Sequence, residues 1–215
     1  KSQLYAVGFT HPGQTEFIAE RCGVSKNNAV MMLAGPDLRV VPMTTHIPLA
    51  EVAGKLDGRL IRQRLRATAK GLQRNFGIEN PRLAVAGFNP HAGEAGNMGR
   101  EELDIFEPAI AQVRSEGFNV IGPLPADTMF HAEARAQYDA ALCAYHDQAL
   151  IPLKTLYFHD AVNITLGLPV VRTSPDHGTA FGIAGQDKAL PHSMIAAIKV
   201  AESAALHRLA AADLG

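Results

Sequence analysis

Short, continuously apolar segments alternate along this chain with longer segments that have a helical repeat. The apolar segments are residues 29–34, 38–43, 83–88, 120–124, 140–145 and 162–166. Runs of this length without polar alternation are typical of strands buried on both faces. A helical repeat is found in residues 56–76 and 101–116, and an Ala-rich helix is expected at 193–209. The alternation predicts an α/β fold with three layers, α/β/α, around a mainly parallel sheet.

Composition and charge exclude several classes of protein. The chain has 20 basic and 21 acidic residues and a net charge of -1, so it carries no overall field for nucleic acid or an anionic membrane. Cys22 and Cys143 lie far apart, which argues against a disulfide framework and fits a reducing cytoplasm. No apolar run approaches the ~18 residues that span a bilayer. The first residue is Lys1 rather than Met, so a fragment or a processed product is expected.

Three histidines each follow a predicted strand. His46 lies in VPMTTHIPL, His91 in LAVAGFNPHAGEAG and His146 in LCAYHDQALIP. In parallel sheets ligands bind at the carboxyl ends of strands, and imidazole is the commonest protein ligand of divalent transition metals. A single histidine at a strand end is more often an ordinary loop residue, and spacings of 45 and 55 residues match no local metal motif. The spacing alone therefore leaves both interpretations open.

The surroundings of two of these histidines favour a ligand site. Gly93, Gly96 and Gly99 follow His91 and give its loop a free backbone that can approach a ligand closely. The GxxGxxG spacing is not the dinucleotide fingerprint. His146 is followed by Asp147, a carboxylate that can orient an imidazole or accept a proton. The alternatives are a plain connection between a strand and a helix for the first segment and an isolated polar pair for the second.

A candidate anion site follows His146 in the sequence. Lys154, Asn163 and Arg172 each lie near the edge of an apolar segment. Together they offer a point charge, a neutral amide donor and a planar guanidinium, which is the set of groups that a phosphate needs. The competing interpretation is that both basic residues are surface charges at the ends of their elements.

Seven segments in order resemble the 4-hydroxythreonine-4-phosphate dehydrogenases across nearly the whole chain. They are PGQTEF (12–17), MMLAGPDLRVVPMTTHIPL (31–49), NPHAGEAGNMGREE (89–102), GPLPADTMF (122–130), YHDQALIPLK (145–154), NITLGLP (163–169) and RTSPDHGTAF (172–181). The resemblance implies the fold of the isocitrate and isopropylmalate dehydrogenases, with two α/β lobes. It also implies an active site in the cleft between the lobes and at the interface of a homodimer.

The resemblance further implies a role for individual residues. The divalent metal would be bound by His46 and His91 of one subunit and by His146 of its partner. Lys154, Asn163 and Arg172 would hold the phosphorylated substrate, which Gln14 and Thr15 would also contact. Asp127 and Asp147 would be the catalytic carboxylates near the reacting carbon.

The implied reaction is the oxidation and decarboxylation of 4-phosphooxy-L-threonine to 3-amino-2-oxopropyl phosphate, a step of pyridoxal 5'-phosphate biosynthesis. It would use NAD or NADP and a divalent metal, which the residues leave open as zinc, cobalt, magnesium, manganese or nickel. Residues 1–190 are expected to form the metal- and substrate-binding dimerisation lobe. Residues 191–215 are expected to form a helix that packs back on a first lobe, most of which is missing from this sequence.

The chain departs from the family pattern at Gln14, where family members usually have His, so one substrate contact is a neutral amide. Related enzymes that oxidise phosphoerythronate or phosphothreonate are the first alternative. An inactive, metal-binding dimer module is the second alternative, and a metal-dependent hydrolase that uses no nucleotide is the third.

Overall fold

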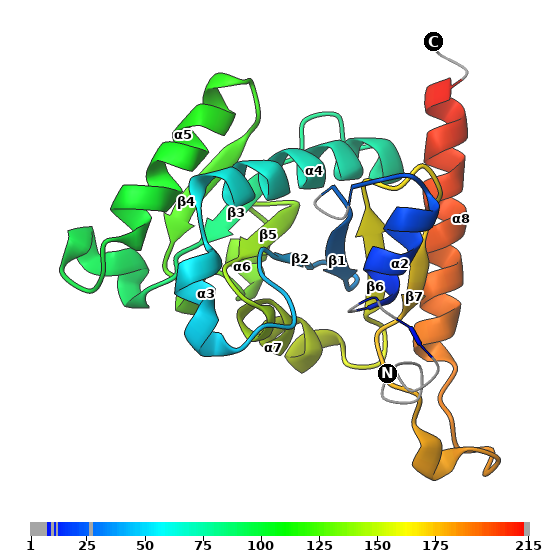
Figure 1. Ribbon diagram of the computed structural model, residues 1–215. Helices are drawn as coiled ribbons and strands as arrows, with labels where there is room; N and C mark the ends of the chain where they lie inside the picture. Colours follow the sequence, from blue (N-terminus) through cyan, green and yellow to red (C-terminus); the bar gives the residue numbers. More distant parts are fainter. Residues whose placement is uncertain (1–7, 10, 12, 26–27, 213–215) are drawn as a thin grey trace.

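A computed structural model of the chain describes residues 8–212 except residues 10, 12, 26 and 27 (Figure 1). Three parts of the predicted features lie outside the described residues: Pro12 of the PGQTEF segment, residues 1–7 of the expected first unit and residues 213–215 of the expected terminal helix. The strands are β1 (Val30–Ala34), β2 (Arg39–Pro42), β3 (Leu83–Ala86), β4 (Val120–Leu124), β5 (Ala140–Cys143), β6 (Val162–Leu166) and β7 (Thr173–Pro175). The six predicted strands are thus confirmed. The short, polar β7 was not predicted, because it has no apolar run.

The helices connect and cover these strands. The α-helices are α2 (Gln14–Arg21), α3 (Leu49–Lys55), α4 (Gly58–Phe76), α5 (Glu107–Ser115), α6 (Ala132–Arg135), α7 (His146–Tyr157) and α8 (His192–Ala212). Short helical turns are η1 (Pro90–Gly96), the π-helical η2 (Glu102–Phe106), η3 (Ala126–Thr128) and η4 (Phe181–Ile183). The helix predicted at 56–76 begins two residues later than expected, because the carboxylate of Asp57 accepts a hydrogen bond from Leu60 N at 2.6 Å and caps the first turn.

One seven-stranded sheet has the order β4-β3-β5-β2-β1-β6-β7. The pairs β3–β4, β3–β5 and β2–β5 are parallel, whereas β1 runs antiparallel to both β2 and β6, and β7 runs antiparallel to β6. Five strands therefore point one way and only β1 and β7 point the other way. The mainly parallel sheet is confirmed, and its ligand-binding edge is the one where β2, β3, β5 and β6 end.

Apolar side chains cover both faces of the sheet. Alternate residues of a strand enter different clusters, as Met32 and Leu33 do in β1. On one face Leu65 of α4 and Phe106 of η2 belong to the larger cluster, whereas Leu153 of α7 lies in the smaller cluster on the other face. Figure 1 shows α4 and α5 on one side of the sheet and α7 on the other. The three-layer α/β/α arrangement is confirmed.

Helix α8 runs beside α4 and the β6–β7 edge of the sheet (Figure 1). Its buried side includes Ala197 and Ala204, and its large apolar side chains are mostly exposed, among them Ile198 at 60% and Leu209 at 63%. The expected division of the chain at residue 190 stays a prediction. Among the described residues, no helix combines the length and the hydropathy that crossing a bilayer requires.

Candidate active site

Parallel pairing of β2 with β5 brings two of the three histidines together. Pro42 and Cys143 are partners in this pairing, and the ladder continues beyond the strands through Met43 N to Cys143 O at 2.8 Å. The hydroxyl of Thr44 then donates to Ala144 O at 2.8 Å. His46 and His146 follow directly, and their ring centroids are 5.5 Å apart. Two residues 100 positions apart thus meet because two neighbouring parallel strands end at the same edge.

His46 adopts a backbone conformation that is unusual for its residue type. Its φ angle is 49°, in the left-handed region that favours glycine. Non-glycine residues in this region are strained by about 1–3 kcal/mol and concentrate at functional sites. Such strain is typical of a position whose side chain takes part in a site.

His146 is the first residue of α7, and its ring is oriented by its neighbour. The Nδ1 atom lies 2.7 Å from Asp147 Oδ1. A carboxylate on Nδ1 fixes the ring and directs Nε2, the other nitrogen, to a cation or a substrate. Asp147 is therefore placed to orient the imidazole, although its own side chain is 69% exposed.

Gln148 ties this turn to the neighbouring strand β3. Its Oε1 accepts a hydrogen bond from Ala144 N at 2.7 Å, and its Nε2 donates to Gly87 O at 2.8 Å. Both backbone groups belong to buried residues. This role cannot be predicted from the sequence, because a glutamine inside a helix gives no signal that its side chain bridges two strand ends.

The loop that carries His91 leaves the same edge of the sheet, after β3. Residues 91–95 of η1 all have positive φ, and the side chain of His91 is exposed. The buried carboxylate of Glu102 supports the start of the loop by accepting hydrogen bonds from Phe88 N and Asn89 N, both at 2.7 Å. His91 does not line the cavity that contains the other two histidines.

Arg172 forms the centre of the predicted anion site. It precedes β7, and its guanidinium donates to Asn163 Oδ1 and Thr165 Oγ1, both at 3.2 Å, and to Gln14 Oε1 at 2.9 Å. Burial lowers the pKa of this guanidinium. No carboxylate of the described residues pairs with it. A half-buried cation with neutral partners is a favourable place for an anion.

Lys154 is the second basic group of the site. It lies two helical turns after His146 on α7, and its Nζ is 3.2 Å from Asp176 Oδ2 and 3.3 Å from Asp176 O. Burial raises the pKa of Asp176 above its usual range, while the charge of Lys154 opposes this rise. The contact between Asp176 and Lys154 likewise cannot be predicted from the sequence, although Asp176 lies in the polar RTSPDHGTAF segment.

One cavity of about 590 Å³ joins these groups. Seven of the ten predicted site residues line it: Gln14, Thr15, His46, His146, Lys154, Asn163 and Arg172. A smaller cavity of about 240 Å³ shares both histidines and adds Asp147. The imidazole pair and the basic cluster therefore face the same space, whose volume suits a small phosphorylated ligand.

Two predicted residues, His91 and Asp127, line neither of these cavities in the single chain. Asp127 is exposed in η3, which follows β4 at the far edge of the sheet. Within the described part of the chain, no three His, Cys, Asp or Glu side chains converge closely enough to hold a metal. One chain thus supplies two imidazoles at one point, and the distribution of ligands between subunits stays a prediction.

The fold and the site define a class of α/β protein that has paired imidazoles and a desolvated arginine at the carboxyl edge of a mainly parallel sheet. Residues 1–201 match the family described as pyridoxal phosphate biosynthetic protein PdxA. The chain belongs to this family.

Proteins of similar sequence carry the name 4-hydroxythreonine-4-phosphate dehydrogenase. The protein of Zymomonas mobilis is 58% identical over 213 residues, which are 99% of this chain and 64% of that protein. The protein of Erythrobacter litoralis is 59% identical over 97% of this chain and 62% of its own length. The chain therefore spans somewhat less than two thirds of the relatives that it matches.

Solved structures show the same fold. The 4-hydroxythreonine-4-phosphate dehydrogenase of Klebsiella pneumoniae superposes with a TM-score of 0.85 at 42% identity, over 95% of this chain and 62% of that one. A terephthalate 1,2-cis-dihydrodiol dehydrogenase of Burkholderia xenovorans superposes with a TM-score of 0.73 at 33% identity, over 93% of this chain and 63% of that one. Structures that carry different substrate names therefore share this fold.

Proposed function

We propose that this chain forms the metal- and phosphate-binding part of a 4-hydroxythreonine-4-phosphate dehydrogenase. The complete enzyme would use NAD or NADP to oxidise and decarboxylate 4-phosphooxy-L-threonine to 3-amino-2-oxopropyl phosphate, in the cytoplasm. The names of the relatives support this reaction. The observation in the chain itself that carries the proposal is that one cavity is lined both by the imidazole pair and by the half-buried Arg172, which has no carboxylate partner among the described residues.

A divalent cation fits the donor set of this cavity. His46 and His146 are close neighbours, and Asp147 holds Nδ1 of His146 so that Nε2 is the nitrogen for a ligand. Zinc, cobalt, manganese and nickel all accept imidazole, and magnesium is the least favoured by nitrogen donors. When bound, the cation lowers the pKa of the substrate hydroxyl and polarises the carbonyl that replaces it.

Two imidazoles are fewer protein ligands than a catalytic metal usually has. We propose His91 as the third ligand and a homodimer as the arrangement that completes the set. The exposure of His91 on a loop at the same sheet edge supports this role, since an exposed side chain can reach a neighbouring subunit. The proposed set takes His46 and His146 from one subunit and His91 from its partner, whereas the resemblance assigns His46 and His91 to one subunit and His146 to the partner. Asp127, at the far edge of the sheet, would likewise reach a reacting carbon only in the assembled dimer.

The other cavity residues would bind and orient the substrate. Arg172 offers a planar pair of donors to the phosphate oxygens, and Lys154 adds a point charge. Gln14 and Asn163 hold the guanidinium through 2.9 and 3.2 Å hydrogen bonds, so its plane is fixed before a ligand arrives. Thr15 lies beside Gln14 at the start of α2 and lines the same cavity. This arrangement would direct the reacting carbon towards the histidines.

The full-length protein with His146→Ala tests the metal proposal. We expect loss of bound metal and of NAD reduction together, because the variant removes one of two converging imidazoles. His131→Ala is a matched control, since His131 Nδ1 pairs with Glu133 Oε2 at 2.8 Å on the surface in a similar way, and His131 lines neither cavity of the candidate site. An active, metal-free His146→Ala protein would contradict the proposed role.

A dehydrogenase of phosphoerythronate or phosphothreonate is the alternative, and it rests on Gln14 in contact with Arg172. Comparing kcat/KM for these acids and for 4-phosphooxy-L-threonine, with the wild type and with Gln14→His, separates the two. A preference for the four-carbon acids in the wild type would favour the alternative.

The 215-residue chain could also be an inactive metal-binding dimer module. Titrating it with NAD and with NADP tests this alternative. Tight binding of either nucleotide would exclude the inactive module.

A further inference from the structure

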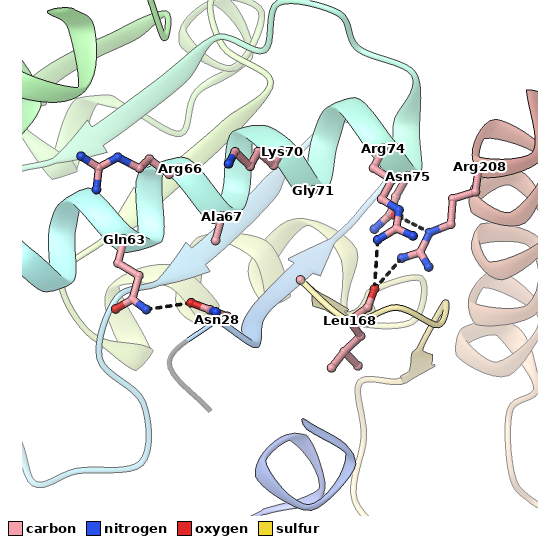
Figure 2. A pocket seen from close by; sticks show the side chains of 11 residues that line it. Asn28, Gln63, Arg66, Ala67, Lys70, Gly71, Arg74, Asn75, Leu168 and Arg208 are labelled. Atoms are coloured by element: carbon pink, nitrogen blue, oxygen red, sulfur yellow. Dashed lines mark hydrogen bonds between the residues drawn. The ribbon is translucent and has the colours of Figure 1, made fainter. Parts of the chain in front are cut away.

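A second cavity, of about 550 Å³, lies between α4, α8 and the loop after β6 (Figure 2). It shares no lining residue with the cavity of the candidate active site. Four basic residues line it: Arg66, Lys70 and Arg74 of α4, and Arg208 of α8. The three residues of α4 are four positions apart and therefore lie along one side of the helix.

Only one of these four cations has a carboxylate partner in the described part of the chain. Arg66 is paired with Glu116, with Nε 2.6 Å from Oε2. Lys70 is exposed and has no described partner. Arg74 and Arg208 donate to neutral oxygens of the described residues. Among the described residues, three of the four cations that line the cavity thus have no carboxylate within ion-pair distance.

The two arginines converge on one short stretch of backbone. Arg208 donates to Asn75 Oδ1 and Pro169 O, both at 2.8 Å, and to Leu168 O at 3.3 Å, and Arg74 donates to the same Leu168 O at 3.5 Å. Figure 2 shows both guanidinium groups directed at Leu168 from different helices. Burial lowers the pKa of Arg208, and the like charge of Arg74 lowers it further. The two guanidinium groups therefore lie close together although their positive charges repel each other.

Neutral carbonyls orient guanidinium groups but do not balance their charge. A phosphate group does both, because its oxygens accept from planar donors and its charge offsets like-charge repulsion. The rest of the lining is uncharged: Asn28 and Gln63, which bond each other at 3.0 Å, and the small or apolar Ala67, Gly71 and Leu168. The volume suits a small organic molecule.

We propose that this α4–α8 cavity binds a small phosphorylated metabolite, with Arg74, Arg208 and Lys70 around its phosphate or diphosphate group. The uncharged organic part of the metabolite would lie against Ala67, Gly71 and Leu168. The site is separate from the proposed dehydrogenase chemistry, so either proposal can fail without the other.

Lysine footprinting of the 215-residue chain with inorganic pyrophosphate tests the site. We expect pyrophosphate to slow the modification of Lys70 by an amine-reactive reagent, read by mass spectrometry. Lys154 reports independently on the candidate active site, and Lys199, exposed on α8 outside both cavities, reports on neither. Modification of Lys70 that pyrophosphate leaves unchanged would overturn the proposal.

Calorimetric titration with two variants gives a second measurement. Lys70→Gln removes an exposed side chain without a described partner, so the fold is retained, and we expect pyrophosphate to bind this cavity about tenfold more weakly. Lys199→Gln removes one charge from α8 outside the cavity and should bind like the wild type. Equal affinities of the two variants would reject the site. Adenosine diphosphate, which also contains a diphosphate group, tests whether the bound metabolite is a nucleotide. Protection of Lys70 at lower concentrations than pyrophosphate requires would identify a nucleotide. Protection only at equal or higher concentrations would identify a metabolite that is not a nucleotide.

Discussion

Replacing Gln148 by methionine should destabilise the protein by about 2–4 kcal/mol, although the two side chains have similar size. The amide of Gln148 makes hydrogen bonds of 2.7 Å with Ala144 N and 2.8 Å with Gly87 O. Both partners belong to buried residues, so methionine leaves a donor and an acceptor unpaired. Each such group costs about 1–3 kcal/mol, and the lower half of that range applies because the polypeptide relaxes around the change. For a chain of this length, 3 kcal/mol lowers Tm by roughly 6–12 °C.

Urea unfolding of the wild type and of two matched variants measures this effect. Gln73→Met is the control, because Gln73 donates to Glu79 O at 2.9 Å on the exposed side of α4, and we expect a change below about 0.5 kcal/mol. Gln148→Met should also weaken cobalt binding, since the same amide holds the turn before His146. A Gln148→Met protein as stable as Gln73→Met would refute the view that this side chain joins β3 to the β5–α7 turn.

Three further changes test other features of the structure. His46→Gly should leave stability within about 1 kcal/mol of the wild type, because relief of the left-handed strain offsets the entropy of glycine, yet it should weaken cobalt binding in a spectroscopic titration. Burial raises the pKa of the Cys143 thiol and shields it, so a thiol reagent should label Cys22 in the native protein and Cys143 only after unfolding. Hydrogen bonds from Tyr157 and Arg135 lower the pKa of Asp37. The ionised carboxylate should therefore stabilise the folded protein above about pH 4, and this stabilisation should be lost as the pH falls through the lowered pKa. Asp37→Asn should then reduce the free energy of unfolding at pH 7, by no more than about 1 kcal/mol after solvent screening, and this loss should shrink as the pH falls through the lowered pKa of Asp37.

The sequence predicts the sheet well because its strands are continuously apolar. The order and the directions of the strands cannot be predicted from this apolar content. The strand at 30–34 looks like its neighbours in composition, yet β1 runs antiparallel between β2 and β6. Its direction depends on the tight connection between β1 and β2, residues 35–38, which is too short to cross the sheet. Apolar content reports burial and does not report direction.

The candidate site shows the same division between local and tertiary information. The sequence places His46 and His146 after strands that end at one edge of the sheet, but it does not predict that they meet within one chain, because the resemblance assigns His146 to the partner subunit; in the single chain their ring centroids are 5.5 Å apart. Gln148 and Asp176 could not be expected, because their roles depend on backbone atoms far away in the sequence. His91 shows a third case, in which the resemblance predicts a ligand but the single chain leaves the side chain on an exposed loop.

The contact between Gln14 and Arg172 limits what the departure at position 14 changes. A guanidinium only donates hydrogen bonds, so the amide oxygen of Gln14 must face Arg172. The distance from Arg172 Nη2 to Gln14 Oε1 is 2.9 Å. The amide NH2 is then directed away from Arg172 and remains a donor for a ligand oxygen. A neutral histidine at this position would likewise turn its unprotonated nitrogen to Arg172 and keep one N–H for the ligand. Glutamine at position 14 therefore preserves a donor beside the anion site and removes the capacity to carry a positive charge there in addition to those of Arg172 and Lys154.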